Sequence, residues 1–91
     1  MEDLILNPEK YNNMFVRVDK MVLFLNDNDY RFKVYAPGRF ENRCWTNYGS
    51  CENYEQCKLA VADDQMITIY GYFRYNGGIN SMYFDALKID F

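Results

Sequence analysis

The sequence predicts a single all-β domain with one short helix, and three observations lead to this fold class. Aromatic residues make up 19% of the chain, and they fit the pleated surface of a sheet better than a helix. Apolar and polar residues alternate in several segments, which is the period of a strand with one buried face. A chain of 91 residues has too little interior to divide into two cores, so residues 1–91 are expected to form one domain.

Composition and charge narrow the functional classes. The chain is 49% hydrophobic and 25% charged, which is ordinary for a folded globular domain. Its net charge of -3 disfavours nonspecific adhesion to DNA or to an anionic membrane. No apolar stretch is long enough to span a membrane, and acidic residues stand near the start, where a signal peptide needs a basic segment. These features predict a cytoplasmic protein that has no membrane partner.

The first half of the chain is predicted to hold three strands within residues 14–48, after a lead-in over residues 1–13. Asn7 and Pro8 favour one helical turn ending at Tyr11. The first strand covers residues 14–25, and its end is apolar on both faces. That end is either fully buried or shifted in phase by a bulge near residues 19–20.

The second and third strands follow a turn at residues 26–29. In the strand over residues 30–36, Arg31, Lys33 and Tyr35 share one side, which is predicted to face solvent. Pro37 and Gly38 break this strand, and a third strand is predicted over residues 40–48. Its alternation places Cys44 and Trp45 on opposite faces.

The second half is predicted to hold one helix and a hairpin. Apolar residues at three- and four-residue spacing predict a short helix within residues 50–62, with Ser50 as its cap. The hairpin covers residues 66–91, where Gly77 and Gly78 are expected to supply positive φ angles for a tight turn. The order is therefore three strands, a helix and two strands.

This order is that of the five-stranded Greek-key barrel called the OB-fold. Segments 15–22 and 66–73 share one pattern of alternate apolar residues leading to a bend position. They resemble the first and fourth strands of bacterial OB-fold domains of the tRNA-anti-like family, and the resemblance covers residues 8–90. In that family the residue at the bend is usually glycine. Gly71 matches this pattern, and Lys20 departs from it. A cysteine in the third strand, here Cys44, also resembles that family.

Such barrels bind ligands on the face of strands 2 and 3. Residues 17–43 carry six basic and four acidic residues, a net charge of +2 inside an acidic chain. The predicted partner-binding residues are Arg17, Arg31, Lys33, Tyr35, Arg43 and Trp45. The same pattern is typical of ordinary solvated strands, and a lone Trp in a small barrel is often partly core, so both alternatives stay open.

The sequence predicts neither a metal site nor an enzyme, and it calls for no cofactor. Cys44, Cys51 and Cys57 are spaced too widely for a structural zinc site, and the chain has no histidine. Free, inert thiols are expected. No catalytic triad or glycine-rich phosphate loop is present, and Asp63 and Asp64 are typical of a solvated turn.

Two binding functions remain. The first is a non-catalytic module that recognises a protein partner through exposed Tyr, Trp and Arg side chains. The second is a protein that binds single-stranded nucleic acid by stacking bases on the same face. In size and charge the chain resembles small phage-encoded inhibitors of the anti-CRISPR type, which implies a nucleic-acid-processing machine as the partner. We expect the protein-partner function, because the net negative charge works against affinity for a nucleic-acid strand.

Overall fold

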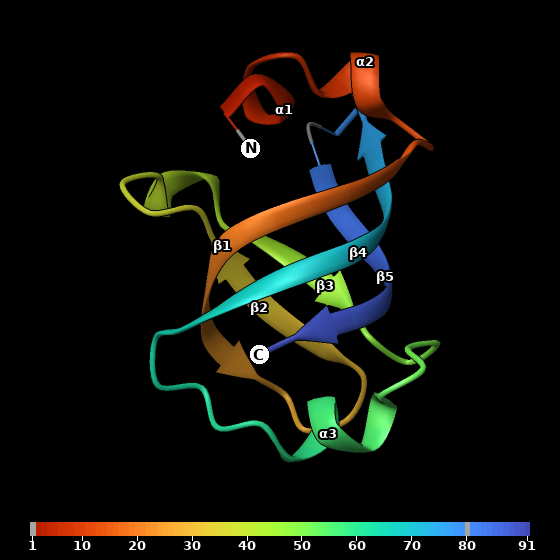
Figure 1. Cartoon of the computed structure of the whole chain (residues 1–91). Coiled ribbons are helices and arrows are strands. Elements are labelled where there is room, and N and C mark those ends of the chain that lie inside the picture. The colour runs from red at the N-terminus through yellow and green to blue at the C-terminus, as the bar shows by residue number, and fades with distance from the viewer. Residues whose placement is uncertain (1, 80) are drawn as a thin grey trace.

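Five strands close into a barrel in the order β1-β2-β3-β5-β4, as Figure 1 shows. The computed structural model describes residues 2–79 and 81–91. The strands are β1 (Phe15–Asn26), β2 (Arg31–Tyr35), β3 (Cys44–Asn47), β4 (Gln65–Asn76) and β5 (Ser81–Asp90). The helices are α1 (Glu2–Leu6), α2 (Pro8–Tyr11), the 3-10 helix η1 (Phe40–Asn42) and α3 (Tyr54–Leu59). The predicted all-β, OB-like barrel is confirmed.

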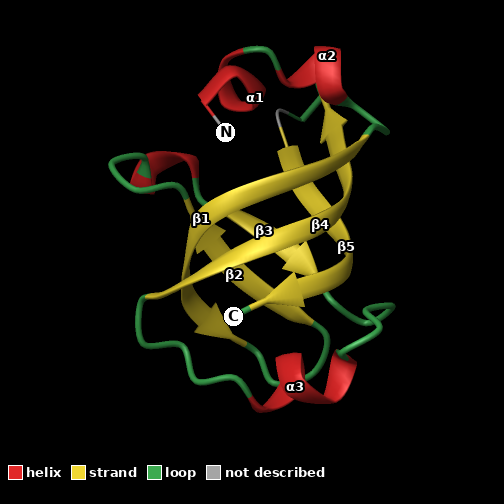
Figure 2. Cartoon of the chain, in the orientation of Figure 1, coloured by secondary structure: helices red, strands yellow, loops and turns green. Residues whose placement is uncertain are grey.

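The pairing between strands is that of a Greek-key barrel. Strands β1, β2 and β3 form an antiparallel meander, β5 runs parallel to β3, and β4 pairs antiparallel with both β5 and β1. Figure 2 shows that the strands form the body of the molecule and that the short helices lie at its ends. Helix α3 connects β3 to β4, at the predicted place in the chain.

Strand β1 pairs with two strands, β4 and β2, and it bends along its length. It pairs with β4 from Phe15 to Leu23, with a register shift between Val18 and Met21. Within this bulge Lys20 has a φ of 58°, a left-handed conformation that glycine adopts at little cost. The second half also pairs with β2, from Val22 to Asn26. Of the two alternatives for the end of this strand, the bulge at residues 19–20 is therefore present.

Strand β4 bends at Gly71, where it crosses closest to β5. The β4–β5 register shifts between Tyr70 and Gly71. A Cβ atom on Gly71 would stand 2.6 Å from the Cα atom of Ala86 and closer still to the carbonyl oxygen of Asp85. The predicted glycine bend is therefore confirmed at this position.

Apolar side chains from all five strands fill the barrel, and helices close its two ends. Phe32, Phe73 and Phe84 are fully buried. Leu4 and Ile5 of α1 join the same core, and so does Cys57 of α3. The lead-in thus contains a helix before the predicted turn, because its two apolar residues cover the open end of the barrel. Asn7 precedes α2 but makes no side-chain cap hydrogen bond; its side-chain amide donates to Asp3 (3.0 Å).

The third strand and the α3 helix are shorter than predicted. Residues 40–42 form η1, which is held against β1 and β2 by ring contacts of Phe40 with Phe24 and Tyr35 (5.4 and 5.1 Å between centroids). Helix α3 begins at Tyr54 rather than near Ser50. Asn53, just before it, exchanges hydrogen bonds with the backbone of Ile89 and so ties the helix to β5.

Asn26 fixes the other end of α3 to the barrel. Its side-chain amide donates to the carbonyl oxygens of Cys57 (3.0 Å) and Ala60 (2.9 Å). Its side-chain oxygen accepts from the hydroxyl of Tyr48 (2.8 Å), a residue that is fully buried. Burial raises the pKa of that hydroxyl, so it stays protonated and able to donate.

The β4–β5 hairpin forms where predicted, but its glycines do not have the predicted dihedral angles. Gly38 is the glycine with positive φ in the described part of the chain. The turn is instead stabilised by Asn76, whose side-chain oxygen accepts from the Gly78 amide (3.0 Å). None of the helices within residues 2–79 and 81–91 has the length and apolar character needed to cross a membrane.

Candidate partner-binding face

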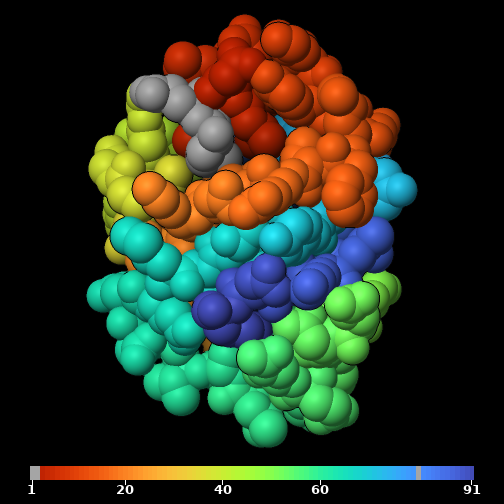
Figure 3. Space-filling model, in the orientation of Figure 1, coloured from red at the N-terminus to blue at the C-terminus, as the bar shows by residue number. Residues whose placement is uncertain are grey.

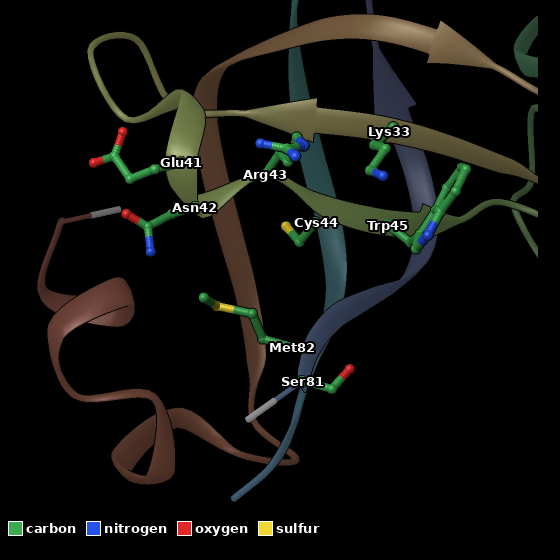
Figure 4. Close-up of a pocket in the computed structure, with 8 residues that line it drawn as sticks. All are labelled: Lys33, Glu41, Asn42, Arg43, Cys44, Trp45, Ser81 and Met82. Atoms are coloured by element: carbon green, nitrogen blue, oxygen red, sulfur yellow. The ribbon is translucent and has the colours of Figure 1, made fainter. Parts of the chain in front are cut away.

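The outer surface of β2, β3 and β5 carries a row of aromatic and basic side chains. Lys33 is the register partner of Trp45, and Trp45 is the register partner of Tyr83. Side chains at paired positions share one face of a sheet, and Figure 4 shows Lys33 beside Trp45. Because Phe32, Val34, Cys44 and Thr46 point into the core, this row must face outward. We call Arg31, Lys33, Trp45 and Tyr83 the aromatic–cation face.

Arg31 covers one side of the Trp45 ring. The centre of its guanidinium lies 4.0 Å from the centre of the indole, a cation–π contact. The same group donates from Nε to Asp27 at 2.9 Å. Arg31 therefore holds Trp45 in a fixed orientation while its own charge is balanced by a carboxylate.

The turn between β1 and β2 fixes the side chain of Asp27 in the position from which it contacts Arg31. One of its side-chain oxygens accepts from the backbone amides of Asp29 (3.0 Å), Tyr30 (3.1 Å) and Arg31 (3.1 Å). Burial works in the opposite direction, but these amides and the Arg31 side chain lower the pKa of Asp27 below its ordinary 3.8. The carboxylate is therefore charged at neutral pH.

Two basic residues on this side of the barrel keep their charges unpaired. Among the described residues, neither Lys33 nor Arg43 has a carboxylate partner. The Lys33 amine lies 5.1 Å from the centre of the Trp45 ring. The Arg43 guanidinium lies 4.8 Å from the centre of the Phe40 ring. These two cations are available to a ligand at low electrostatic cost.

The Trp45–Tyr83 pair separates two surface hollows along the strands. One, of about 430 Å³, is drawn in Figure 4 and includes Lys33, Arg43, Trp45 and Met82 in its lining. The other, of about 530 Å³, includes Tyr30, Tyr72 and the ion pair of Arg74 with Asp85 (2.9 Å). Trp45, which is half-buried, therefore forms part of the wall of the first hollow.

The structure divides the six predicted partner-binding residues among three places. Arg31, Lys33 and Trp45 lie together on the aromatic–cation face. Tyr35 and Arg43 both contact Phe40 at the edge of that face, where the Tyr35 ring also packs against Phe24 (5.4 Å). Tyr35 thus helps to hold the loop that carries Arg43.

Arg17 lies apart from the other five, on the first half of β1, which pairs with β4. Its guanidinium is 5.7 Å from the centre of the Tyr70 ring. Its Nε atom contacts Asp19 at 3.1 Å. It therefore belongs to the β1–β4 surface.

Tyr83 and Arg74 belong to the row but are missing from the predicted site. Tyr83 is the register partner of both Trp45 and Arg74, so the row runs from β2 through β3 and β5 to β4. The sequence did contain a signal for the place of Tyr83. In an OB-fold the last strand runs beside the third, so alternate residues of the segment 81–91 extend the solvent-facing side of the third strand.

The three cysteines of the chain lie in the core rather than on this face. The thiol of Cys44 lies beneath it, and burial raises its pKa to about 12. A hydrogen bond to Cys57, together with burial, raises the pKa of the Cys51 thiol. All three cysteines are free and buried. The described residues contain no cluster of Cys, Asp and Glu arranged to hold a metal ion.

The fold and this face together define a small OB-like barrel with an aromatic, basic surface over β2, β3 and β5. Comparison with family models, with curated proteins and with solved structures gave no match for this chain. The resemblance to the tRNA-anti-like family therefore stays a prediction.

Proposed function

We propose that the chain is a non-catalytic binding module whose aromatic–cation face recognises a protein partner. The observation that carries the proposal is the position of Arg31, which lies between Asp27 and Trp45 (2.9 and 4.0 Å). Asp27 balances the charge of the Arg31 guanidinium, and the guanidinium fixes the orientation of Trp45, the aromatic anchor. A preorganised Trp loses little conformational entropy on binding, and Trp, Tyr and Arg dominate the energetics of protein interfaces.

The same observation weighs against nucleic acid as the ligand. Affinity for a strand comes mainly from cations that replace its counterions, and the charges of Arg31 and Arg74 are already balanced by Asp27 and Asp85. Base stacking needs an open ring face, and Arg31 covers one face of Trp45. The specific form of this proposal is an inhibitor of a nucleic-acid-processing machine. The aromatic–cation face would anchor the partner, while the chain outside residues 17–43, with a net charge of -5, steers it toward a basic surface.

One observation favours the alternative, a protein that binds single-stranded nucleic acid. Lys33 and Arg43, which have no carboxylate partner in the described chain, line the same hollow as Trp45. They would place two cations beside a stacking platform. A short single strand of nucleic acid crossing this hollow would then meet the aromatic ring and the cations that form an OB-fold nucleic-acid site.

Titration with labelled single-stranded oligonucleotides at two salt concentrations separates the two functions. The proposal predicts no saturable binding below about 100 µM, the weak end of nonspecific affinities at physiological salt. Tighter binding that Lys33→Glu and Arg43→Glu weaken, with a shallower salt dependence, would establish the alternative. Thermal unfolding of both variants verifies that they are folded.

A further inference from the structure

We propose that a second surface, around α3 and the end of β5, docks a basic amphipathic segment of a protein. This surface contains four apolar side chains that are exposed to solvent. They are Leu59 (76% exposed), Val61 (70%), Met66 (54%) and Phe91 (36%). We call these four residues the α3 apolar patch.

Three of the four residues line two neighbouring hollows. A hollow of about 370 Å³ is lined by Leu59, Ala60 and Phe91 together with two glutamines. A second hollow, of about 320 Å³, includes Met66 and Phe91 in its lining. Phe91 is common to both, so the two hollows lie next to each other. Val61 lies two residues beyond Leu59, in the segment that leaves α3. Figure 3 shows the dark blue end of the chain beside the teal segment that follows α3.

The patch is fixed in place from beneath. The Phe91 ring packs edge-on against the buried Phe32 (6.2 Å between centroids). Asn26 holds the backbone of Ala60, between Leu59 and Val61, at 2.9 Å. Contiguous exposed apolar surface on a rigid support is typical of interaction sites.

Charge identifies the chemistry of the occupant. Residues 50–65 carry four acidic residues and one basic residue, a net charge of -3. Within the part of the chain that the structure describes, Glu55, Asp63 and Asp64 have no cation partner. An exposed apolar patch carried mostly by this acidic segment is complementary to a helix with apolar residues on one face and Lys or Arg along its flanks. This proposal goes beyond the proposed function and does not depend on the aromatic–cation face.

The test uses a labelled amphipathic helical peptide made of Leu and Lys and a matched peptide made of Leu and Glu. Fluorescence anisotropy measures the binding of each to the full chain. We expect the Leu/Lys peptide to bind and the Leu/Glu peptide to bind much more weakly. Leu59→Ser with Val61→Ser should weaken Leu/Lys binding by about tenfold or more, because two apolar side chains lose their burial. Amide NMR shifts should centre on residues 59–66 and on Phe91.

Two matched controls make the result specific. Leu6→Ser with Ile79→Ser removes two equally exposed apolar residues (64% and 73%) from α1 and the β4–β5 hairpin, at the other end of the barrel (Figure 1). Binding should be unchanged. Asp63→Asn with Asp64→Asn should weaken binding at low salt, whereas Glu9→Gln with Glu41→Gln removes the same charge elsewhere and should have a smaller effect.

Three outcomes would overturn the proposal. Peptide binding that survives Leu59→Ser with Val61→Ser, in a variant shown to be folded, would place the site elsewhere. Equal binding of the Leu/Glu peptide would remove the argument from charge. Self-association of the wild-type chain that the same double variant abolishes, measured by sedimentation, would assign the patch to a second copy of the protein.

Discussion

Gly71 and Ala86 are register partners on β4 and β5, and a Cβ atom on Gly71 would stand 2.6 Å from the Cα atom of Ala86. Both contacting segments are backbone in the middle of the barrel wall, so neither can move aside as a flexible side chain would. The close approach allows β4 to bend and pair with β1 on one side and β5 on the other.

We expect Gly71→Ala to destabilise the barrel. The added methyl group must push β4 away from β5 and should lower the free energy of unfolding by about 3 kcal/mol. Chemical denaturation measures the change. Gly49→Ala is the matched control, because its new Cβ atom would meet Tyr30 at an ordinary 3.6 Å. Equal stability of the two variants would contradict the close approach.

Lys20→Gly is expected to stabilise the protein. Lys20 has a φ of 58°, a conformation in which a Cβ atom is strained. Relief of this strain should exceed the entropy that glycine adds to the unfolded chain, so the free energy of unfolding should rise by about 0.5–1 kcal/mol. Lys20→Ala keeps the Cβ atom and should gain nothing. If alanine stabilised the protein as much as glycine, the effect would lie in the lysine side chain rather than in the backbone.

A buried hydroxyl offers a third test. Thr46 is fully buried in β3, and its Oγ1 atom has no hydrogen-bond partner among the described residues. Thr46→Val keeps the shape and removes the unsatisfied group, so it should raise the free energy of unfolding by about 1 kcal/mol. Thr68→Val should have the opposite sign, because Thr68 donates to Asp19 at 3.2 Å. A destabilised Thr46→Val would show that this hydroxyl is satisfied.

Asp27, in the turn that supports Arg31, should make the free energy of unfolding depend on pH in the acidic range. Because the folded protein lowers the pKa of Asp27 below 3.8, its contribution is complete above the unfolded pKa and is lost as pH falls through the folded pKa. The free energy of unfolding should therefore fall between about pH 5 and about pH 2, and Asp27→Asn should reduce that fall. Denaturant titrations across this range test the point, and identical slopes for the two proteins would refute it.

Local patterns made much of the fold predictable. Alternation identified the strands, and the apolar run at residues 21–25 left two alternatives, full burial or a bulge near residues 19–20. The lead-in helix was missed because burial of Leu4 and Ile5 depends on an open barrel end, which no local pattern records. The third strand was predicted too long because ring contacts of Phe40 with Phe24 and Tyr35 favour a 3-10 turn over continued alternation.

The candidate site was predictable only in part, for the same reason. Lys33 and Trp45 follow from alternation within neighbouring strands. Tyr83 joins them through a parallel pairing between β3 and β5, which is a property of the closed barrel. Arg17 was grouped with the site by its nearness in sequence, but the bend in β1 places it beside Tyr70 on another face.

Capture with matched baits can show whether Trp45 anchors a protein partner. Wild type, Trp45→Ala and Tyr70→Ala, each shown to be folded, are used to capture proteins from the native host after nuclease treatment. Tyr70 is the control because it is also an outer aromatic residue near two cations, Arg17 and Lys88 (both 5.7 Å). The account predicts a protein that wild type and Tyr70→Ala retain after nuclease treatment and that Trp45→Ala loses by about tenfold or more. Retention that nuclease abolishes, or that Trp45→Ala leaves unchanged, would contradict it.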